Sequence, residues 1–245
     1  MKKMIQLSQR LQAVANLVGE TGVVADIGTD HGYIPVYLVS SGKAEQAIAM
    51  DVNPGPLQRA LEHIGQFHLQ ERIETRLSDG VKALQPGEAQ AIVIAGMGGA
   101  LMTRILSEGE EVAHMAKPLV LQPQSELSAF RHFLAEHGYR ILEEDMVYED
   151  GKFYSMMAAS WVGRAGSSTG AAAVRAGQMT EPDYKYGPLL LAGRHPVLRQ
   201  YLLQQRMQKY RILENLGKNA RQDVSGRRAQ LLQDLQEIEG ILELW

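Results

Sequence analysis

Residues 26–33 read DIGTDHGY and combine glycines with two carboxylates and a histidine. The glycines resemble those of a turn that binds phosphate groups after a buried strand, but Asp30 stands where the middle glycine of such a turn belongs. A carboxylate at this position repels a phosphate and attracts an ammonium or sulfonium group. We therefore expect Asp26, Gly28 and Asp30 to bind a cationic ligand.

Two further acidic positions follow later apolar runs of the chain. Asp51 lies 25 residues after Asp26, where a carboxylate accepts hydrogen bonds from both hydroxyls of a ribose, and Asn53 follows it. Asp79 and Gly80 end the next run, where an acid commonly receives the exocyclic amine of adenine. Each acid taken alone is also explained as a helix cap or a turn residue. The three together favour S-adenosylmethionine, which carries an ammonium and a sulfonium group and no phosphate.

The sequence AGMGG at residues 95–99 stands where a methyltransferase holds the transferred methyl group. We expect Gly96, Met97 and Gly98 to contact the cofactor. Enzymes that methylate exocyclic amines of adenine or cytosine usually carry an Asn or Asp, two prolines and an aromatic residue here, and this chain does not. Methylation of pyrimidine C5 generally needs a cysteine nucleophile, and the chain has no cysteine. A ring nitrogen, or another nucleophile that already has a lone pair, remains as the methyl acceptor.

Alternating strand and helix patterns position these residues and predict an α/β fold with a Rossmann-like methyltransferase sheet. Asp150-Gly151 between two β-rich stretches is a hairpin signal, so we expect parallel strands closed by an antiparallel C-terminal hairpin. The expected strands are residues 23–27, 46–51, 72–77, 91–96 and 118–123, followed by the hairpin strands 139–149 and 152–161. The expected helices are residues 33–41, 54–69, 99–107 and 125–137.

The remaining chain is expected to form a separate helical segment. We place the methyltransferase domain at 1–162, a Gly/Ala/Ser-rich linker at 163–180 and a helical coiled-coil hairpin at 181–245. A long surface loop within one domain is the alternative to the linker. One long helix is predicted from Val197 to Leu216, ended by Gly217.

The second helix of this hairpin shows steps of four and three along an apolar seam with one polar exception. The seam consists of Val224, Arg228, Leu231, Leu235, Ile238, Leu242 and Trp245. It indicates an antiparallel helical hairpin, and packing of the same stripe on the main domain is the alternative.

Composition narrows the class of protein. Apolar residues make up 45% of the 245 residues and charged residues 22%, as in ordinary soluble proteins. We find no signal peptide or membrane span and expect a cytoplasmic monomer. The absence of cysteine excludes disulfides and thiolate-held metals, and no metal site is expected.

The motifs together resemble those of the bacterial tRNA (adenine-22-N1)-methyltransferases, and the resemblance extends through the C-terminal helices over nearly the whole chain. The family usually has Ser and Ala where Thr29 and Gly32 stand here, and Asn where Gln124 stands. The resemblance implies transfer of a methyl group from S-adenosylmethionine to N1 of an adenine in tRNA. It rests on DIGTDHGYIP (26–35), DVNPGPLQRA (51–60), SDGV (78–81), AGMGG (95–99) and LQPQ (121–124).

The implied reaction assigns candidate catalytic roles to Asp30, His31 and Tyr33. A carboxylate near the methylated ring stabilises its positive charge or takes a proton from its amino group, for which Asp30 and His31 are suited. Tyr33 is suited to stacking on the target base. Each has an alternative: Asp30 only binds the cofactor's amino group, His31 only caps the next helix, and Tyr33 belongs to the core.

Binding of tRNA needs local positive charge, because the whole chain has a formal charge of −3. Residues 181–228 carry ten Lys or Arg against four acids, so we expect the helical hairpin to contact tRNA; a solvated helix face is the alternative. Lys2, Lys3 and Arg10 would add a second basic patch if an N-terminal helix packs near the site. The expected contacts are Arg10, Arg199, Arg206, Lys209 and Arg211.

Three rival functions remain open at this stage, of which the third, a nucleotide-sugar or NAD enzyme, is disfavoured by Asp30. A methyltransferase of another substrate class would share the fold and the cofactor but would not need the basic helices. A non-catalytic RNA-binding module would keep the fold and fail to bind S-adenosylmethionine.

Overall fold

The computed structural model describes residues 5–163, 179–219 and 225–245. The chain divides into two compact units, Met1–Lys185 and Tyr186–Trp245. Most of the expected linker, as well as Lys2, Lys3 and Val224, lies outside the described residues.

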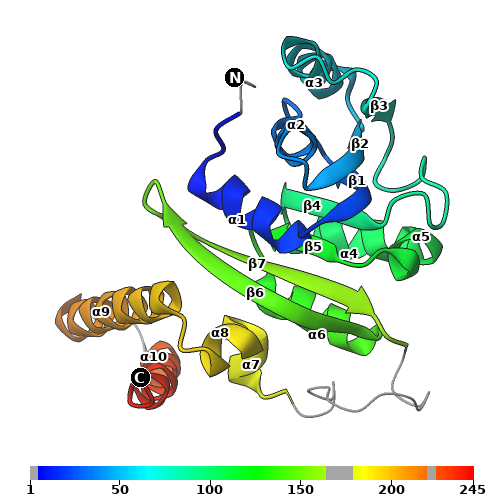
Figure 1. Cartoon of the computed structure of the whole chain (residues 1–245). Coiled ribbons are helices and arrows are strands. Elements are labelled where there is room, and N and C mark those ends of the chain that lie inside the picture. Colours follow the sequence, from blue (N-terminus) through cyan, green and yellow to red (C-terminus); the bar gives the residue numbers. More distant parts are fainter. Residues whose placement is uncertain (1–4, 164–178, 220–224) are drawn as a thin grey trace. The chain divides into compact units, whose positions relative to one another are not determined.

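The first unit is built on a seven-stranded sheet with the order β3-β2-β1-β4-β5-β7-β6 (Figure 1). Five strands run parallel, and β7 pairs antiparallel with both β5 and β6, so the expected sheet is confirmed. The strands are β1 (Thr21–Ile27), β2 (Ala44–Asp51), β3 (Ile73–Leu77), β4 (Ala91–Met97), β5 (Leu119–Pro123), β6 (Tyr139–Glu149) and β7 (Lys152–Trp161).

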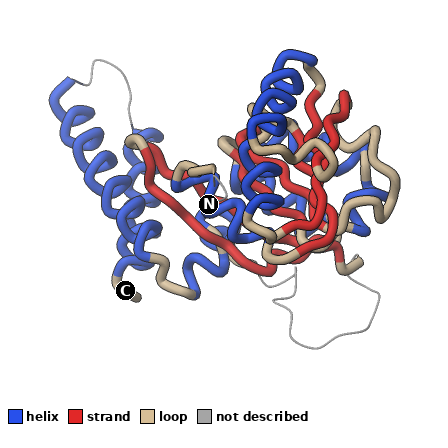
Figure 2. The backbone as a smooth tube through the Cα atoms, turned by 45° about the horizontal axis from the view of Figure 1, so that its top comes forward, coloured by secondary structure: helices blue, strands red, loops and turns tan. Residues whose placement is uncertain are grey.

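Helices cover both faces of the sheet (Figure 2). The alternation of side chains along β1 shows why both faces are apolar: Val24 packs in one buried cluster, and Ala25 and Ile27 pack in the other. Helices α1 (Gln9–Val18), α2 (Tyr33–Ser40) and α3 (Pro54–Gln66) contribute to the first cluster, and α4 (Gly99–Glu108), α5 (Glu110–Met115) and α6 (Leu127–Glu136) contribute to the second.

The turn between β6 and β7 follows the predicted chemistry. Asp150 and Gly151 have φ values of 49° and 78°, the left-handed values of a two-residue hairpin turn. Glu149 pairs with Lys152 across the turn. The hairpin forms a long ribbon at one edge of the sheet, and α1 contacts it (Figures 1 and 2).

The second unit contains α8 (Pro188–Ala192), α9 (Pro196–Asn219) and α10 (Ser225–Leu242), and α7 (Glu181–Tyr186) lies at the boundary. Helices α9 and α10 contact each other, and Leu231, Leu235 and Ile238 of the predicted seam are buried. The expectation that Gly217 ends the long helix is wrong, because α9 continues to Asn219. A glycine lowers helix stability by only about 1 kcal/mol relative to alanine, which neighbouring residues can offset.

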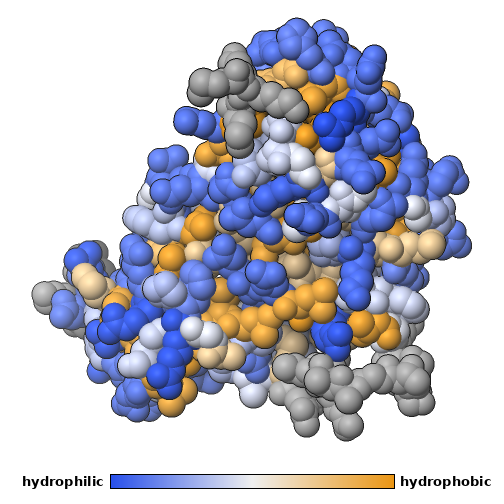
Figure 3. All heavy atoms as spheres, viewed as in Figure 1, coloured by the Kyte–Doolittle hydropathy of each residue, from blue (hydrophilic) through white to orange (hydrophobic). Residues whose placement is uncertain are grey.

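The hydropathy of the surface and of the helices agrees with the mixed apolar and charged composition of the chain. Hydrophilic residues cover most of the face shown in Figure 3, and hydrophobic residues lie in small groups between them. No described helix is long and apolar enough to cross a membrane.

Candidate functional site

The loops after β1 and β4 meet at the carboxyl edge of the sheet. The backbone N–H groups of Gly28 and Thr29 both donate to the carbonyl oxygen of Met50, each at 2.8 Å, so the loop after β1 is tied to the end of β2. Gly28 has φ +75°, and a Cβ atom on it would lie 2.0 Å from Cε of Met97. The positive φ favours glycine, and the close approach to Met97 brings two of the predicted cofactor-binding segments together.

Asp26 lies beneath this loop and is 6% exposed. Burial raises the pKa of its carboxyl group to about 6, the neighbouring Thr29 hydroxyl lowers the pKa, and the nearby charge of Asp51 raises it. A cation placed beside Asp26 would favour the ionised carboxylate. The site therefore has a chemical reason to prefer a positively charged ligand.

Asp51 and Asn53 form a turn at the end of β2. One carboxylate oxygen of Asp51 accepts a hydrogen bond from the backbone N–H of Asn53 at 2.7 Å. Asn53 precedes α3 without capping it through its side chain. The turn fixes the Asp51 carboxylate on the same sheet edge as Asp26.

The Asp30 carboxylate already has a cationic partner within the protein, whereas we expected it to be open to a cationic ligand. Its side chain is 65% exposed, and its Oδ1 lies 2.7 Å from Nη2 of Arg59 and 3.6 Å from Nε2 of His31. Arg59 offsets the negative charge that the sequence assigned to this loop. A ligand that uses Asp30 must share the carboxylate with Arg59 or displace it.

His31 and Tyr33 belong to a cluster of three aromatic rings with His63. The rings of His31 and Tyr33 stack with centroids 5.3 Å apart, and His63 lies 5.6 Å and 5.1 Å from them. The Nδ1 atom of His63 hydrogen-bonds with the carbonyl oxygen of His31 at 2.8 Å. Gly32 caps α2 without any side-chain hydrogen bond, so the alternative of His31 as the cap is wrong.

Sequence reasoning missed two residues that contact the loop after β1: Arg59, which pairs with Asp30, and His63, which hydrogen-bonds with His31. They lie four residues apart on α3 and therefore share one face of the helix.

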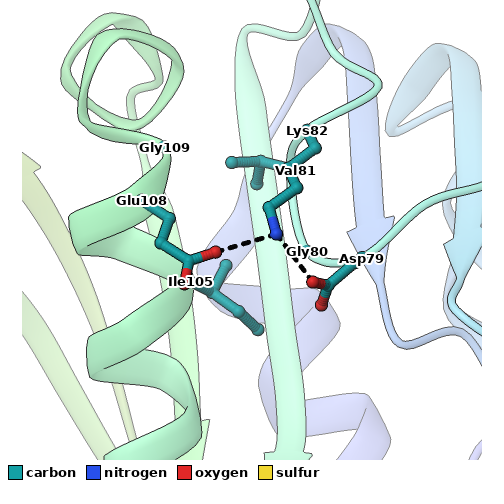
Figure 4. Close-up of a pocket in the computed structure, with 7 residues that line it drawn as sticks. All are labelled: Asp79, Gly80, Val81, Lys82, Ile105, Glu108 and Gly109. Atoms are coloured by element: carbon teal, nitrogen blue, oxygen red, sulfur yellow. Dashed lines mark hydrogen bonds and ion pairs between the residues drawn. The ribbon is translucent and has the colours of Figure 1, made fainter.

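Asp79 and Gly80 line a small pocket with Val81, Lys82 and residues of α4 (Figure 4). Asp79 lies 2.7 Å from Nζ of Lys82 and 3.2 Å from Nη2 of Arg104. Lys82, whose Nζ also lies 2.9 Å from Glu108, lowers the pKa of the Asp79 carboxyl group. Asp79 is thus kept ionised and able to accept a hydrogen bond.

Polar side chains also lie near the end of β4 and the residues that follow it. Gly96 has φ +82°, and a Cβ atom there would lie 3.6 Å from Nε2 of Gln124 and 3.8 Å from Nη1 of Arg10. Arg10 lies on α1, so this helix does reach the predicted site. A Cβ atom on Gly98 would lie 3.1 Å from the hydroxyl of Ser125.

The predicted basic contacts of the helical unit differ in their surroundings. Arg199 and Arg211 are exposed and Arg206 is partly buried. Lys209 lies 2.5 Å from Asp234, so its charge joins α9 to α10. No group of three or more potential metal-ligating side chains occurs in the part of the chain that the structure describes.

Comparison with known sequences identifies the family of the chain. A family model described as a methyltransferase domain matches residues 7–157. The tRNA (adenine(22)-N(1))-methyltransferase of Bacillus subtilis is 32% identical over 234 residues, which cover 96% of this chain and 95% of that protein.

Solved structures agree with this match. The B. subtilis M1A22 tRNA methyltransferase TrmK has a TM-score of 0.74 at 32% identity, covering 98% of this chain and 97% of that one. A Streptococcus pneumoniae protein described as a candidate tRNA (m1A22) methyltransferase, solved with S-adenosyl-L-methionine, has a TM-score of 0.78 at 31% identity and covers 97% and 100% of the two chains. The chain therefore belongs to the tRNA (adenine(22)-N(1))-methyltransferase family.

Proposed function

We propose that this protein transfers the methyl group of S-adenosylmethionine to N1 of adenine 22 in tRNA. The observation that carries the proposal is the 32% identity to the B. subtilis enzyme over 96% of the chain. The acids at three strand ends support it independently, because they suit a cofactor that carries positive charge and no phosphate.

The residues present fit this cofactor. Asp51 is suited to the ribose hydroxyls and Asp79, held ionised by Lys82, to the adenine amine. The tight turn at Gly28 exposes backbone close to Met97, where the methionine part would lie. Gly80, Gly96 and Gly98 complete the proposed lining.

Buried Asp26 supplies negative charge beneath the turn at Gly28. Asp30 is suited to the ammonium group, in exchange for or alongside its contact with Arg59.

Alignment is the main requirement of the reaction. The cofactor supplies an electrophilic methyl group on a sulfonium, and adenine N1 already has an in-plane lone pair. The protein therefore has to orient the adenine, and it does not need to supply a strong proton acceptor. We assign stabilisation of the positive ring, or acceptance of a proton from its amino group, to Asp30 and His31. Tyr33, already stacked on His31, offers a ring for the base.

The target edge must be exposed before it reacts. N1 lies on the Watson–Crick edge, so a paired adenine has to be flipped out or its pair opened. We propose that Arg199, Arg206 and Arg211 of α9 contact tRNA phosphates, with Lys209 contributing less because Asp234 pairs with it. We also propose the monomer in the cytoplasm as the acting form, and residues 1–162 and 181–245 as its two functional segments.

Mass spectrometry of nucleosides tests this proposal. The protein is incubated with unmodified tRNA and methyl-labelled S-adenosylmethionine, and the tRNA is digested and separated against standards. We expect label in 1-methyladenosine. Label in another nucleoside would reject the N1 assignment, and unlabelled tRNA would reject the tRNA methyltransferase function itself.

A further inference from the structure

Arg10 is fixed beside the loop where methyl transfer is proposed to occur. Its Nη1 donates to Oε1 of Gln122 at 2.9 Å, and its Cζ lies 5.4 Å from the centre of the Tyr154 ring. The same Nη1 lies 3.8 Å from where a Cβ atom of Gly96 would be. Three elements distant in sequence, α1, β5 and β7, thus hold one guanidinium at the carboxyl edge of the sheet.

Gln122 is an unusual side chain to find in the interior. It is 0% exposed, at the end of a β5 strand whose residues are all buried. Its Nε2 donates to the carbonyl oxygen of Pro123 at 3.2 Å, which leaves Oε1 aimed at Arg10. Burying an amide is unfavourable unless its polar groups are hydrogen-bonded. The hydrogen bond from Arg10 therefore compensates the burial of the Gln122 amide oxygen.

The charge of Arg10 is available for a ligand. Within the described ranges no carboxylate forms an ion pair with Arg10, whereas Arg59, Arg76 and Arg104 each pair with one. The carboxylate of Glu149 accepts a hydrogen bond from the backbone N–H of Gln9, the residue before Arg10. Arg10 is partly exposed, and a guanidinium has five N–H groups, of which Gln122 takes one.

We infer that Arg10 binds a phosphate group adjoining the target adenosine, and that Gln122 is the positioning residue that aims Arg10 at it. The inference rests on the proposed function. Phosphate fits better than the base itself, because methylation at N1 makes the ring positive and a guanidinium against the ring would oppose that charge. Arginine also matches phosphate oxygens with paired N–H groups.

The first test compares Arg10→Gln with Lys117→Gln, which removes the same charge from an exposed side chain that precedes β5, beyond the end of the strand opposite Gln122. Relative to wild type in the tRNA methylation assay, we expect Arg10→Gln to raise KM for tRNA about tenfold. The Kd for S-adenosylmethionine should stay unchanged. Lys117→Gln should stay within about twofold of wild type, and Arg10→Lys should recover part of the loss. An unchanged KM in Arg10→Gln would overturn the inference.

The second test identifies the phosphate. Full-length tRNA is ligated with a neutral methylphosphonate on the 5′ or the 3′ side of the target adenosine. We expect one of these substitutions to raise KM for wild type and Lys117→Gln but to add little to the defect of Arg10→Gln. Additive effects at both phosphates would contradict the phosphate contact.

The positioning role of Gln122 is tested in the same assay with Gln122→Leu. We expect a higher KM and a weaker sensitivity to the methylphosphonate, at unchanged cofactor affinity. Full sensitivity to the methylphosphonate in this variant would show that Gln122 does not aim Arg10. If wild type itself leaves tRNA unmethylated, the proposed function is wrong and this inference falls with it, which separates the two failures.

Discussion

At the scale of single residues, the site depends on carboxylates that differ in their surroundings. Burial raises the pKa of Asp26 to about 6, and Lys82 lowers the pKa of Asp79. Asp30 is paired with Arg59. We therefore expect the negative charge offered to a cofactor to come mainly from Asp51 and, above pH about 6, from Asp26. Asp30 contributes only as far as a ligand competes with Arg59.

The raised pKa of Asp26 predicts that cofactor affinity depends on pH. Without ligand the carboxyl group is protonated below pH about 6 and ionised above it, and a sulfonium or ammonium group favours the ionised form. The affinity for S-adenosylmethionine should therefore fall as pH drops through about 6, by up to about tenfold per pH unit. Calorimetric titrations between about pH 8 and pH 5 measure this.

Asp26→Asn is the control for that titration. It should bind the cofactor weakly and with little pH dependence over the same range. A wild-type affinity that stays constant across the range would show that Asp26 does not sense the positive charge.

Asp51 allows a second prediction at this scale. Asp51→Ala should weaken S-adenosylmethionine binding about tenfold or more, because the ribose loses its charged acceptor, while the affinity for tRNA stays within about twofold. Asp51→Asn retains an acceptor for the N–H of Asn53 and separates loss of the turn from loss of charge. Calorimetry and filter binding give the two affinities, and a collapse of tRNA binding would place Asp51 elsewhere in the mechanism.

At the scale of elements, a buried ion pair connects α6 to the antiparallel end of the sheet. Nε of Arg131 lies 3.1 Å from Glu144 on β6, with the two side chains 1% and 0% exposed. Nη2 donates to Ser155 on β7, and Nη1 donates to the carbonyl oxygen of Tyr184 in α7. One side chain thus fixes β6, β7 and the segment that follows the sheet.

Removing one partner should be strongly destabilising. Arg131→Met leaves the Glu144 carboxylate in the interior without its guanidinium, so the free energy of unfolding should fall by about 3–5 kcal/mol. Arg131→Met combined with Glu144→Leu should recover much of that loss, because no charge is then buried alone. Urea denaturation measures both, and a double variant no more stable than the single one would contradict this explanation.

Much of the fold was predictable at this scale, because apolar runs, the Asp150-Gly151 turn and the spacing of helical faces are local signals. The whole strand set and the hairpin are confirmed. Helix α5 was missed, since six residues are too few for a periodic pattern. Arg59 and His63 were visible as an i, i+4 pair, but which loop they face is decided by how α3 packs.

The Arg10–Gln122 contact spans 112 positions and has no local signal at all.

At the scale of the whole molecule, the chain consists of an α/β unit and a helical unit, and we propose that the first binds the cofactor and the second contacts tRNA. Residues 181–228 carry a formal charge of +6, but the four acids of residues 229–245 lower the charge of 181–245 to +2. Within the helical unit some of these acids bind α9, as Asp234 does with Lys209 and Glu239 with Tyr210. We therefore expect the tRNA contacts to come from particular arginines of α9 rather than from overall charge.

Deleting residues 186–245 tests whether cofactor binding belongs to the first unit and tRNA binding needs the helical unit. The cut falls after Lys185, which keeps the contacts of Arg131 with Tyr184 and Lys185. The shortened protein should fold and bind S-adenosylmethionine as wild type does, yet methylate tRNA at least about tenfold less efficiently. Circular dichroism, calorimetry and the methylation assay give these three results; full activity would mean that the helices do not contribute to tRNA binding.

Reverse transcription of the treated tRNA tests the central claim most directly, because a methyl group on N1 blocks Watson–Crick pairing. After incubation with the protein and S-adenosylmethionine, we predict that cDNA synthesis stops next to one adenine, position 22, and that replacing this adenine with guanine removes the stop. Methyl incorporation with full-length cDNA throughout would contradict the account, because the methyl group would then lie off the pairing edge.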